Sequence, residues 1–437
     1  MLRQNRSLKF GLSCSLAAAA ALMITPAAFA QTMAIKGGTV LTMAGPVIKS
    51  GTVLMRDGKI VAVGTRVAIP AGTKVVDATG KYVVPGLVDA MTYYGIAPLD
   101  RNDAANPVTP ENRIIYAYFP FGDFARMKSG QPRDRELLSG GVTTIYIAPG
   151  DHQVIGGQGA VVKVSGNNFG NAVLREPASI DMTISDAARY DPRGGKSPST
   201  RMAVVSLIRK ALVNAQQYQR DAESKKDETK RDLGAEALGR MLRRELPARI
   251  EADLVDDIRT SMRIAEEFGF DLVIDSGIGA YRIREALAEK KIPVVLGPIS
   301  HDFVSGEETA ISRLAPEVST LASEENAVLL WKAGVKFALA SFGYGYGFPG
   351  SAYQGRWLLL NAALNVGFGL PEEEALKAVT VNPAEILGVA NRVGSLAAGK
   401  DADVVILSGP PLGLKTWVDQ VYIDGALAYI RRPVSEK

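Results

Sequence analysis

The chain has 437 residues, of which 47% are hydrophobic, 22% charged and 7% aromatic. This composition is typical of a globular protein and excludes a disordered chain or a collagen-like repeat. The formal net charge is +4, but Arg3, Arg6 and Lys9 supply three of these positive charges within the first thirty residues, which contain no acidic residue. The rest of the chain is therefore close to neutral, which gives no support for nucleic acid or an anionic membrane as a partner.

The first thirty residues have the pattern of a secretory signal peptide. A basic stretch over residues 1–9 precedes an apolar run over 11–24, and the segment 28–30 has the small residues that signal peptidase recognises. The run is shorter than the roughly 20 residues of a membrane span, so we expect cleavage after Ala30 and no span in the mature protein. Cys14, the single cysteine, lies in this run. The sequence thus predicts a periplasmic or secreted protein without disulfides.

Short β-strands dominate the next part of the chain, residues 31–81. Strands are expected at 39–43, 52–56 and 59–63, because β-branched and apolar residues there are bounded by turn residues such as Asp57-Gly58. This stretch forms the first part of a β-domain.

The middle of the chain, residues 82–390, alternates strands with helices. Several strands are continuous apolar runs, which is typical of buried strands, and helical patterns such as 257–268 lie between them. The pattern predicts a (β/α)₈ TIM barrel, distorted because the early strands are less regular. The eight expected strands cover residues 83–89, 142–148, 160–164, 180–184, 248–253, 272–276, 293–297 and 336–341.

One insertion, at about residues 201–245, interrupts the barrel pattern. It is helical and charged, and acids and bases are mixed over 220–232. That mixture is typical of a solvated arm, and packing against another subunit is the open alternative.

Strand patterns return in residues 391–437, at 393–405 and 418–430, with turn residues such as Asp424-Gly425. Strands at both ends of the chain, with a barrel between them, predict a composite β-sandwich domain that the two ends build together. Neither end is expected to complete this domain without the other.

Three segments carry a family resemblance. They are YVVPGLVDA at 82–90, ALKAVTVNPAEILG at 375–388 and VGSLAAGKDADVV at 393–405. In order and spacing the segments resemble the amidohydrolase superfamily, in particular its imidazolonepropionase-like branch, and the resemblance runs from about Ile35 to Ile430. It implies a barrel with a composite β-domain, and hydrolysis of non-peptide C–N bonds with one or two divalent metals at the barrel mouth.

The same resemblance puts the family's metal ligands on residues that are unusual as ligands. The two histidines of the first strand fall on Met91 and Tyr93, a thioether that is too soft for zinc and a phenol that ionises with difficulty. The whole chain has two histidines, too few for the family's site. No metal or other cofactor is therefore expected. The bridging lysine, the fifth- and sixth-strand histidines and the eighth-strand aspartate fall on Asp181, Glu251, Ser276 and Phe342.

Acidic residues gather near the carboxyl ends of the expected strands, where ligands bind in barrels. They are Asp89, Asp181, Glu251, Asp253 and Asp275. One alternative is that Lys163, Arg249 or solvent neutralises them. The other is a hard divalent cation, Ca²⁺, Mg²⁺ or Mn²⁺, held by Asp181, Glu251 and Asp253.

Histidines and aromatic residues are the other candidates at the mouth. His301 follows the seventh strand as either an acid/base group or a hydrogen-bonded loop residue, and His152 precedes Gly156, Gly157 and Gly159, which we interpret as a turn. Aromatic residues could bind a ligand or plug the space of a lost metal centre. These residues are Tyr93, Phe342, Tyr344 and Tyr346.

Two main hypotheses follow. The first is a catalytically degenerate amidohydrolase, a pseudoenzyme that acts as a binding or structural subunit in a homo- or hetero-oligomer with an active paralogue. The second is an active exported hydrolase of amide or peptide-like substrates with a rebuilt carboxylate site at Glu251, Asp275 and His301. Solute capture without turnover is a third class.

Overall fold

The computed structural model describes residues 32–97, 100–103, 106–119, 134–164, 172–189, 198–224, 230–298, 321–342 and 355–432. The expected signal peptide, His301, Tyr344 and Tyr346 lie outside the described residues. Within those described ranges, no helix combines the length and the apolar character needed to cross a membrane.

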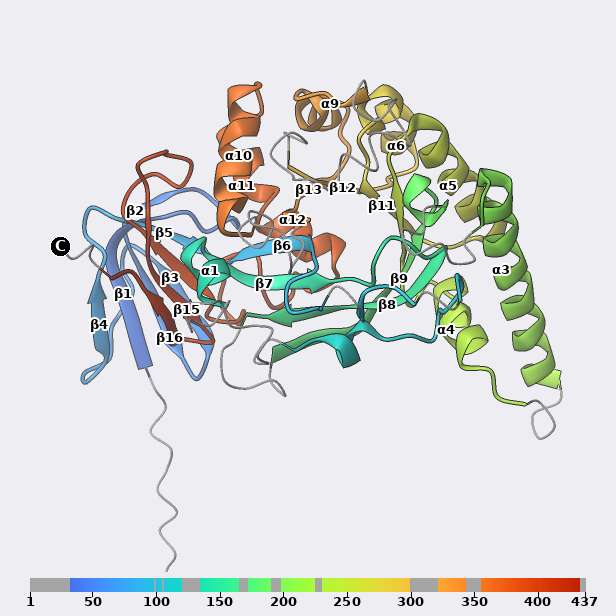
Figure 1. Cartoon of the computed structure of the whole chain (residues 1–437). Coiled ribbons are helices and arrows are strands. Elements are labelled where there is room, and N and C mark those ends of the chain that lie inside the picture. Colours follow the sequence, from blue (N-terminus) through green and yellow to red (C-terminus); the bar gives the residue numbers. More distant parts are fainter. Residues whose placement is uncertain are drawn as a thin grey trace, which may run out of the picture. The chain divides into compact units, whose positions relative to one another are not determined.

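Strands from both ends of the chain form one eight-stranded sheet (Figure 1). Its central strand β5 pairs in parallel with β1 and antiparallel with β14, so strands from both ends complete it. This confirms the expected second, composite β-domain. The strands are β1 (Thr32–Val40), β2 (Ile48–Arg56), β3 (Lys59–Gly64), β4 (Lys74–Asp77), β5 (Tyr82–Pro85), β14 (Val404–Leu407), β15 (Val418–Ile423) and β16 (Ala426–Ile430).

Hydrogen bonds join all eight strands into a single sheet, because β1 pairs with β4 over 33–36 and with β5 over 39–40. Residues from both chain ends, such as Ile35, Met55, Val83 and Ile406, share one apolar core. The two halves of the β-domain are therefore stabilised by the same buried surface.

The second sheet is the nearly closed barrel, which confirms the predicted fold class. Its strand order is β13-β12-β11-β10-β9-β8-β7-β6. All neighbouring strands are parallel except β8, which is antiparallel to both β7 and β9. The strands are β6 (Leu87–Thr92), β7 (Val142–Ile147), β8 (Ile155–Lys163), β9 (Val173–Thr183), β10 (Ala248–Ala252), β11 (Leu272–Ser276), β12 (Val294–Leu296) and β13 (Phe337–Leu339).

Two details of the barrel differ from the sequence expectation. The expected first strand divides at Gly86, where a Cβ atom would lie 2.0 Å from the Thr143 hydroxyl, so β5 joins the β-domain and β6 begins the barrel. The predicted turn at Gly156, Gly157 and Gly159 is wrong, because these glycines lie inside strand β8. The connection from β7 to β8 is too short for a crossover helix, which explains the reversed direction.

Hydrogen bonds between β6 and the residues that follow β13 close the seam between these two strands. The Asp89 carboxylate accepts a hydrogen bond from the Ser341 backbone N–H at 2.9 Å and another from the Ser341 hydroxyl. The Phe342 N–H donates to the Met91 carbonyl at 3.0 Å. Asp89 thus takes the place of a strand ladder at the carboxyl end of the barrel.

Helices cover the outside of the barrel (Figure 1). In the expected insertion, α3 buries Val204, Ile208 and Leu212, so one face of it packs on the protein and is not solvated. The helices are α1 (Asp134–Ser139), α3 (Arg201–Ser224), α4 (Leu233–Leu242), α5 (Val255–Phe268), α6 (Arg284–Glu289), α9 (Asn326–Lys332), α10 (Leu358–Gly367), α11 (Glu372–Lys377) and α12 (Val381–Ile386).

A buried lysine joins the barrel to the β-domain. Lys163, at the end of β8, is 1% exposed and its Nζ lies 2.7 Å from Asp401, 3.0 Å from Asp403 and 2.5 Å from Asp424. Burial raises the pKa of Asp401, but hydrogen bonds from Lys163 and Lys59 outweigh burial and lower it to about 2. Lys163 is the buried cation that these three carboxylates share.

We expect Lys163→Met to lower the free energy of unfolding by about 3–5 kcal/mol, because it leaves buried carboxylates without their cation. Lys59→Met is the matched control, since the Lys59 side chain is 49% exposed and its loss should cost less than about 1 kcal/mol. Urea unfolding at pH 7.5 measures both. Equal losses for the two variants would contradict the assigned role of Lys163.

Candidate functional site

A buried arginine lies at the centre of the barrel. Arg249 of β10 is 2% exposed, and its guanidinium donates to both carboxylate oxygens of Asp275 on β11, at 2.9 and 2.7 Å. It also donates to the Ala90 carbonyl of β6 at 2.9 Å. One side chain thus joins three barrel strands through charge-assisted hydrogen bonds.

A tyrosine extends this network to β9. The Arg249 guanidinium carbon lies 3.8 Å from the ring centroid of Tyr146 on β7, which is a cation–π contact. The Tyr146 hydroxyl donates to Asp181 at 2.6 Å and lies 2.5 Å from the Ser179 hydroxyl. Gly159 makes room for the phenol, because a Cβ atom there would lie 1.9 Å from the hydroxyl oxygen.

The interior charges shift one another's protonation. Burial raises the pKa of Asp181 to about 7 and that of Asp89 to about 6, although Arg249 acts to lower both. Burial lowers the pKa of Arg249, but the Asp275 carboxylate and Tyr146 raise it above its ordinary value. Arg249 is therefore a permanent cation in the barrel interior.

Glu251 follows Arg249 by two residues and lies nearer to the barrel mouth. Burial, followed by the carboxylates of Asp151 and Asp253, raises its pKa well above the ordinary value. The Ser185 hydroxyl donates to Glu251 at 3.3 Å. Glu251 is therefore a carboxyl group with a raised pKa beside acidic neighbours, which is an arrangement that can serve acid/base chemistry.

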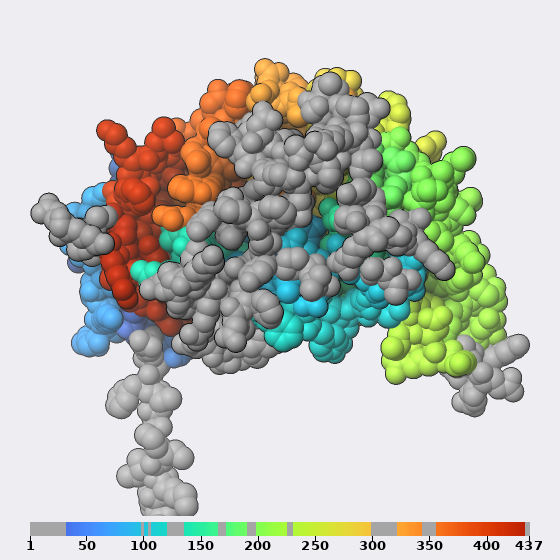
Figure 2. Space-filling model, viewed as in Figure 1, coloured from blue at the N-terminus to red at the C-terminus, as the bar shows by residue number. Residues whose placement is uncertain are grey.

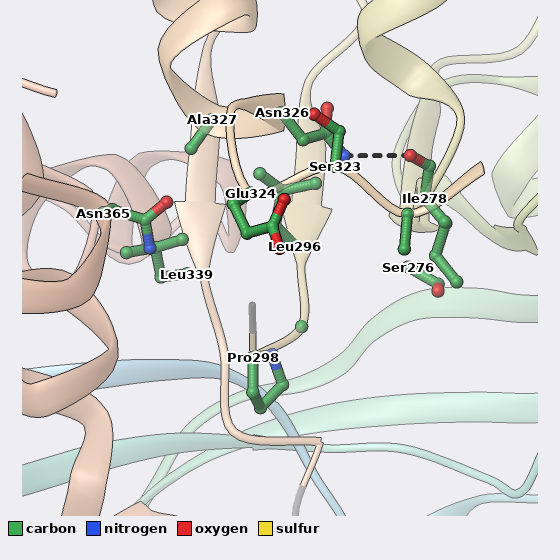
Figure 3. Close-up of a pocket in the computed structure, with 12 residues that line it drawn as sticks. Ser276, Ile278, Leu296, Pro298, Ser323, Glu324, Asn326, Ala327, Leu339 and Asn365 are labelled. Atoms are coloured by element: carbon green, nitrogen blue, oxygen red, sulfur yellow. Dashed lines mark hydrogen bonds between the residues drawn. The ribbon is translucent and has the colours of Figure 1, made fainter. Parts of the chain in front are cut away.

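A small cavity lies at the carboxyl ends of β11, β12 and β13 (Figure 3). It has a volume of about 50 Å³ and is lined by side chains that include Ser276, Leu296, Glu324 and Asn365. Asn326 fixes one wall by donating to the Ile278 carbonyl at 3.2 Å. This space is large enough for a few water molecules and is far below the 300–1,000 Å³ or so of a typical ligand pocket.

Comparison with known proteins gives several solved structures that cover nearly the whole chain, and one of them is also similar in sequence. The crystal structure of an amidohydrolase from Thermotoga maritima MSB8 is 35% identical in sequence, with a TM-score of 0.80 over 91% of this chain and 100% of that one. The chain belongs to the amidohydrolase family. The amidohydrolase family model itself matches residues 307–428.

Sequence relatives agree with this assignment at lower identity. Amidohydrolase tasK of Hapsidospora irregularis is 26% identical over 397 residues, but the match spans 38% of the length of tasK. An imidazolonepropionase of Anaeromyxobacter dehalogenans is 25% identical over 358 residues, which is 77% of each chain. A prolidase complexed with N-methylphosphonate-L-proline has a TM-score of 0.58 at 16% identity and supports the fold alone.

The positions onto which the sequence resemblance puts metal ligands lie at or near strand ends, and the side chains of Met91 and Tyr93 are part of the barrel core. Met91 and Tyr93 are 4% and 2% exposed, within the apolar core of the barrel. Arg101 stacks over the Tyr93 ring at 4.7 Å. Ser276 and Phe342 have positive φ angles of 70° and 48°, a strained conformation for residues other than glycine.

The family's metal does not fit the described residues. Across them, no three His, Cys, Asp or Glu side chains are grouped to hold a metal ion. Asp181, one of the three carboxylates expected for a cation, accepts hydrogen bonds from Tyr146 and Ser179. Arg249 already supplies a positive charge to this interior, so we derive no chemistry through a metal.

Sequence reasoning identified part of this network. Arg249 was expected to neutralise the interior acids and does so for Asp275, whereas Lys163 pairs with carboxylates of the β-domain. Tyr146 was missed. The sequence feature that could have identified it is a tyrosine on a buried strand together with Gly159 on the neighbouring strand. Which glycine faces the tyrosine ring depends on the antiparallel register of β8 and could not be predicted.

We expect Arg249→Met to lower the free energy of unfolding by about 3–5 kcal/mol at pH 7.5, because it leaves a buried carboxylate without its partner. Arg263→Met, on the exposed face of α5, should change it by less than about 0.5 kcal/mol. Urea unfolding measures both variants. Adding Asp275→Asn to Arg249→Met should restore part of the loss, and purely additive losses would contradict the pairing.

Asp181 should make the protein less stable as the pH rises. Its pKa is about 7 in the folded protein against an ordinary value of 3.8, so the folded state binds the extra proton between these values. The free energy of unfolding should therefore fall from about pH 4 to about pH 7, by up to ~1.4 kcal/mol per pH unit. Asp181→Asn should flatten this slope and Asp256→Asn, on the exposed face of α5, should not. Equal slopes for wild type and Asp181→Asn would contradict the assignment.

Proposed function

We propose that this chain is an exported amidohydrolase-family protein without the family's metal-dependent hydrolysis, which acts as a binding or structural subunit with an active amidohydrolase. The observation that carries the proposal is the buried Arg249–Asp275 pair beneath the expected ligand positions. A guanidinium neutralises carboxylates as a metal ion would. It has no open coordination position and cannot activate a bound water as a metal does.

The replaced ligand side chains support the same proposal. Met91 and Tyr93 are buried in the apolar core, where a hydrolytic metal would need neutral imidazoles and access to water. The cavity at the ends of β11–β13 is too small for an amide or a peptide-like substrate. Among the relatives, imidazolonepropionase indicates the class of C–N substrate that an active partner would hydrolyse.

Glu251 supports a second candidate, an active hydrolase of amide or peptide-like substrates that uses carboxyl groups. Burial and the neighbouring Asp151 and Asp253 carboxylates raise the pKa of Glu251, which favours its protonated form. A protonated carboxyl group can donate to a leaving amine while a neighbouring carboxylate accepts a proton from water. This candidate needs no metal and predicts activity in metal-free protein.

We expect elemental analysis of the purified mature protein to find metal far below one ion per chain. Chelator should leave the midpoint of thermal unfolding unchanged, since no metal contributes to folding. Assays with N-acyl amino acids and dipeptides should show no turnover. Stoichiometric metal together with hydrolysis that chelator abolishes would contradict the proposal.

Glu251→Gln separates the two candidates. If the carboxyl mechanism operates, metal-free protein hydrolyses a substrate and Glu251→Gln lowers kcat by roughly 100-fold or more. Asp256→Asn, an exposed carboxylate on α5, is the matched control and should leave kcat unchanged. Wild-type protein without turnover counts against this second candidate.

A further inference from the structure

Helix α10 exposes apolar side chains and buries polar ones, which is the reverse of the usual pattern of a barrel helix. Apart from Gly367, its exposed positions are Trp357 at the N-cap, Leu360, Leu364 and, at the C-cap, Phe368, with exposed fractions of 49%, 36%, 43% and 44%. Asn361 and Asn365 point inward and are 8% and 2% exposed. Surface helices normally bury apolar residues and expose polar ones.

These four apolar side chains lie in one stripe. Their spacing of three or four residues puts neighbours on the same face of a helix. Residues 357–370 contain no charged residue. Figure 2 shows the orange part of the chain that includes α10 reaching the surface at the top of the view. We call Trp357, Leu360, Leu364 and Phe368 the α10 face.

Another helix of the same barrel shows what a solvated face looks like in this protein. All exposed positions of α5 carry charges. They are Asp256, Arg259, Arg263, Glu266 and Glu267. The contrast indicates that the α10 face is adapted to a partner and not to water.

The exposed area of the α10 face can be compared with that of apolar patches on other proteins. Two aromatic side chains of about 200 Å² each, roughly half exposed, and two leucines give an apolar patch of roughly 300 Å². The largest apolar patch on a typical monomer is about 300–600 Å², and such patches are often functional. A standard dimer buries about 800 Å² per partner. The α10 face therefore matches the apolar centre of a dimer interface, with flanking residues supplying the rest.

We propose that the α10 face packs against the same face of a second copy of this chain across a two-fold axis. A two-fold axis brings each residue near its own counterpart, which is favourable for an uncharged apolar stripe and unfavourable for a charged one. Trp357 and Leu364 are anchors of this contact, in the manner of large apolar residues at the centre of interfaces.

The flanking charges argue against a lipid surface as the occupant. Glu372 and Glu373 are exposed at the start of α11, which directly follows the α10 face. Arg356, on the other side, lies 3.5 Å from Glu136 and stacks on Trp357 at 5.2 Å. Anionic membranes attract basic rims and repel acidic ones.

The inference goes beyond the proposed function, because it assigns the α10 face to a second copy of this chain and not to an active amidohydrolase. Its test needs no activity, so the two can fail separately. Sedimentation equilibrium of the mature protein from about 1 to about 50 µM should show a dimer. Leu364→Glu should raise the dimer Kd by roughly 100-fold or more, because dimerisation would bury an unpaired charge.

Val213→Glu is the matched control, since it adds the same charge at an apolar position of α3 that is 50% exposed. It should leave the dimer Kd unchanged. Leu364→Gln tests the contact without adding charge and should weaken the dimer less than Leu364→Glu does. Far-ultraviolet circular dichroism and the thermal midpoint check that each variant is folded.

Three results would overturn the inference. The first is wild-type protein that stays monomeric at about 50 µM, and the second is a dimer whose Kd Leu364→Glu leaves unchanged. The third is monomeric protein that associates only with an added active amidohydrolase or with phosphatidylglycerol vesicles, which would assign the α10 face to another occupant.

Discussion

The Arg249–Asp275 ion pair is the interaction on which the barrel interior depends. A barrel with carboxylates on several inward-facing strands cannot fold stably near pH 7 unless a cation lies among them or protons neutralise them. Arg249 meets this need for Asp275 with two hydrogen bonds and acts on Asp181 and Asp89 through its charge. Asp181 and Asp89 retain protons up to about pH 6–7 as the second means of neutralisation. The same guanidinium packs on the Tyr146 ring, so Arg249 both pairs with a carboxylate and contacts an aromatic side chain of the barrel interior.

A buried cation also neutralises carboxylates where the barrel meets the β-domain. Lys163 is buried among three carboxylates, two of which belong to the GKDAD segment that helped to identify the family. Asp89 does comparable work at the seam, where its carboxylate bonds to Ser341 in place of a strand ladder. Each of these charged residues connects segments far apart in the sequence, and each loss would leave a buried charge without its partner.

The fold was largely predictable because its signals are local. Buried apolar runs marked several of the barrel strands, the alternation with helical patterns indicated the others, and turn residues marked the β-domain. The direction of β8, the division of the first strand at Gly86 and the glycines inside β8 were not predictable, because they depend on contacts with Thr143 and Tyr146 across the sheet. In the site, the acidic residues and Arg249 were identified. Their pairing was not, since it requires the register that aligns Glu251 with Asp275 and places Arg249 two residues earlier.

Ser276 and Phe342 have a left-handed backbone conformation at the carboxyl ends of the barrel strands. Left-handed backbone at residues other than glycine costs about 1–3 kcal/mol each, and it persists where the surrounding structure imposes it. Both residues stand at or just after strand ends, at positions onto which the sequence resemblance puts metal ligands, and they carry a hydroxyl and a benzyl group. In the proposed function, the energy of a metal centre no longer offsets that strain, and the Arg249 and Lys163 ion networks are the remaining stabilising charges. A barrel stabilised in this way is free to use its outer surface, including α10, for association.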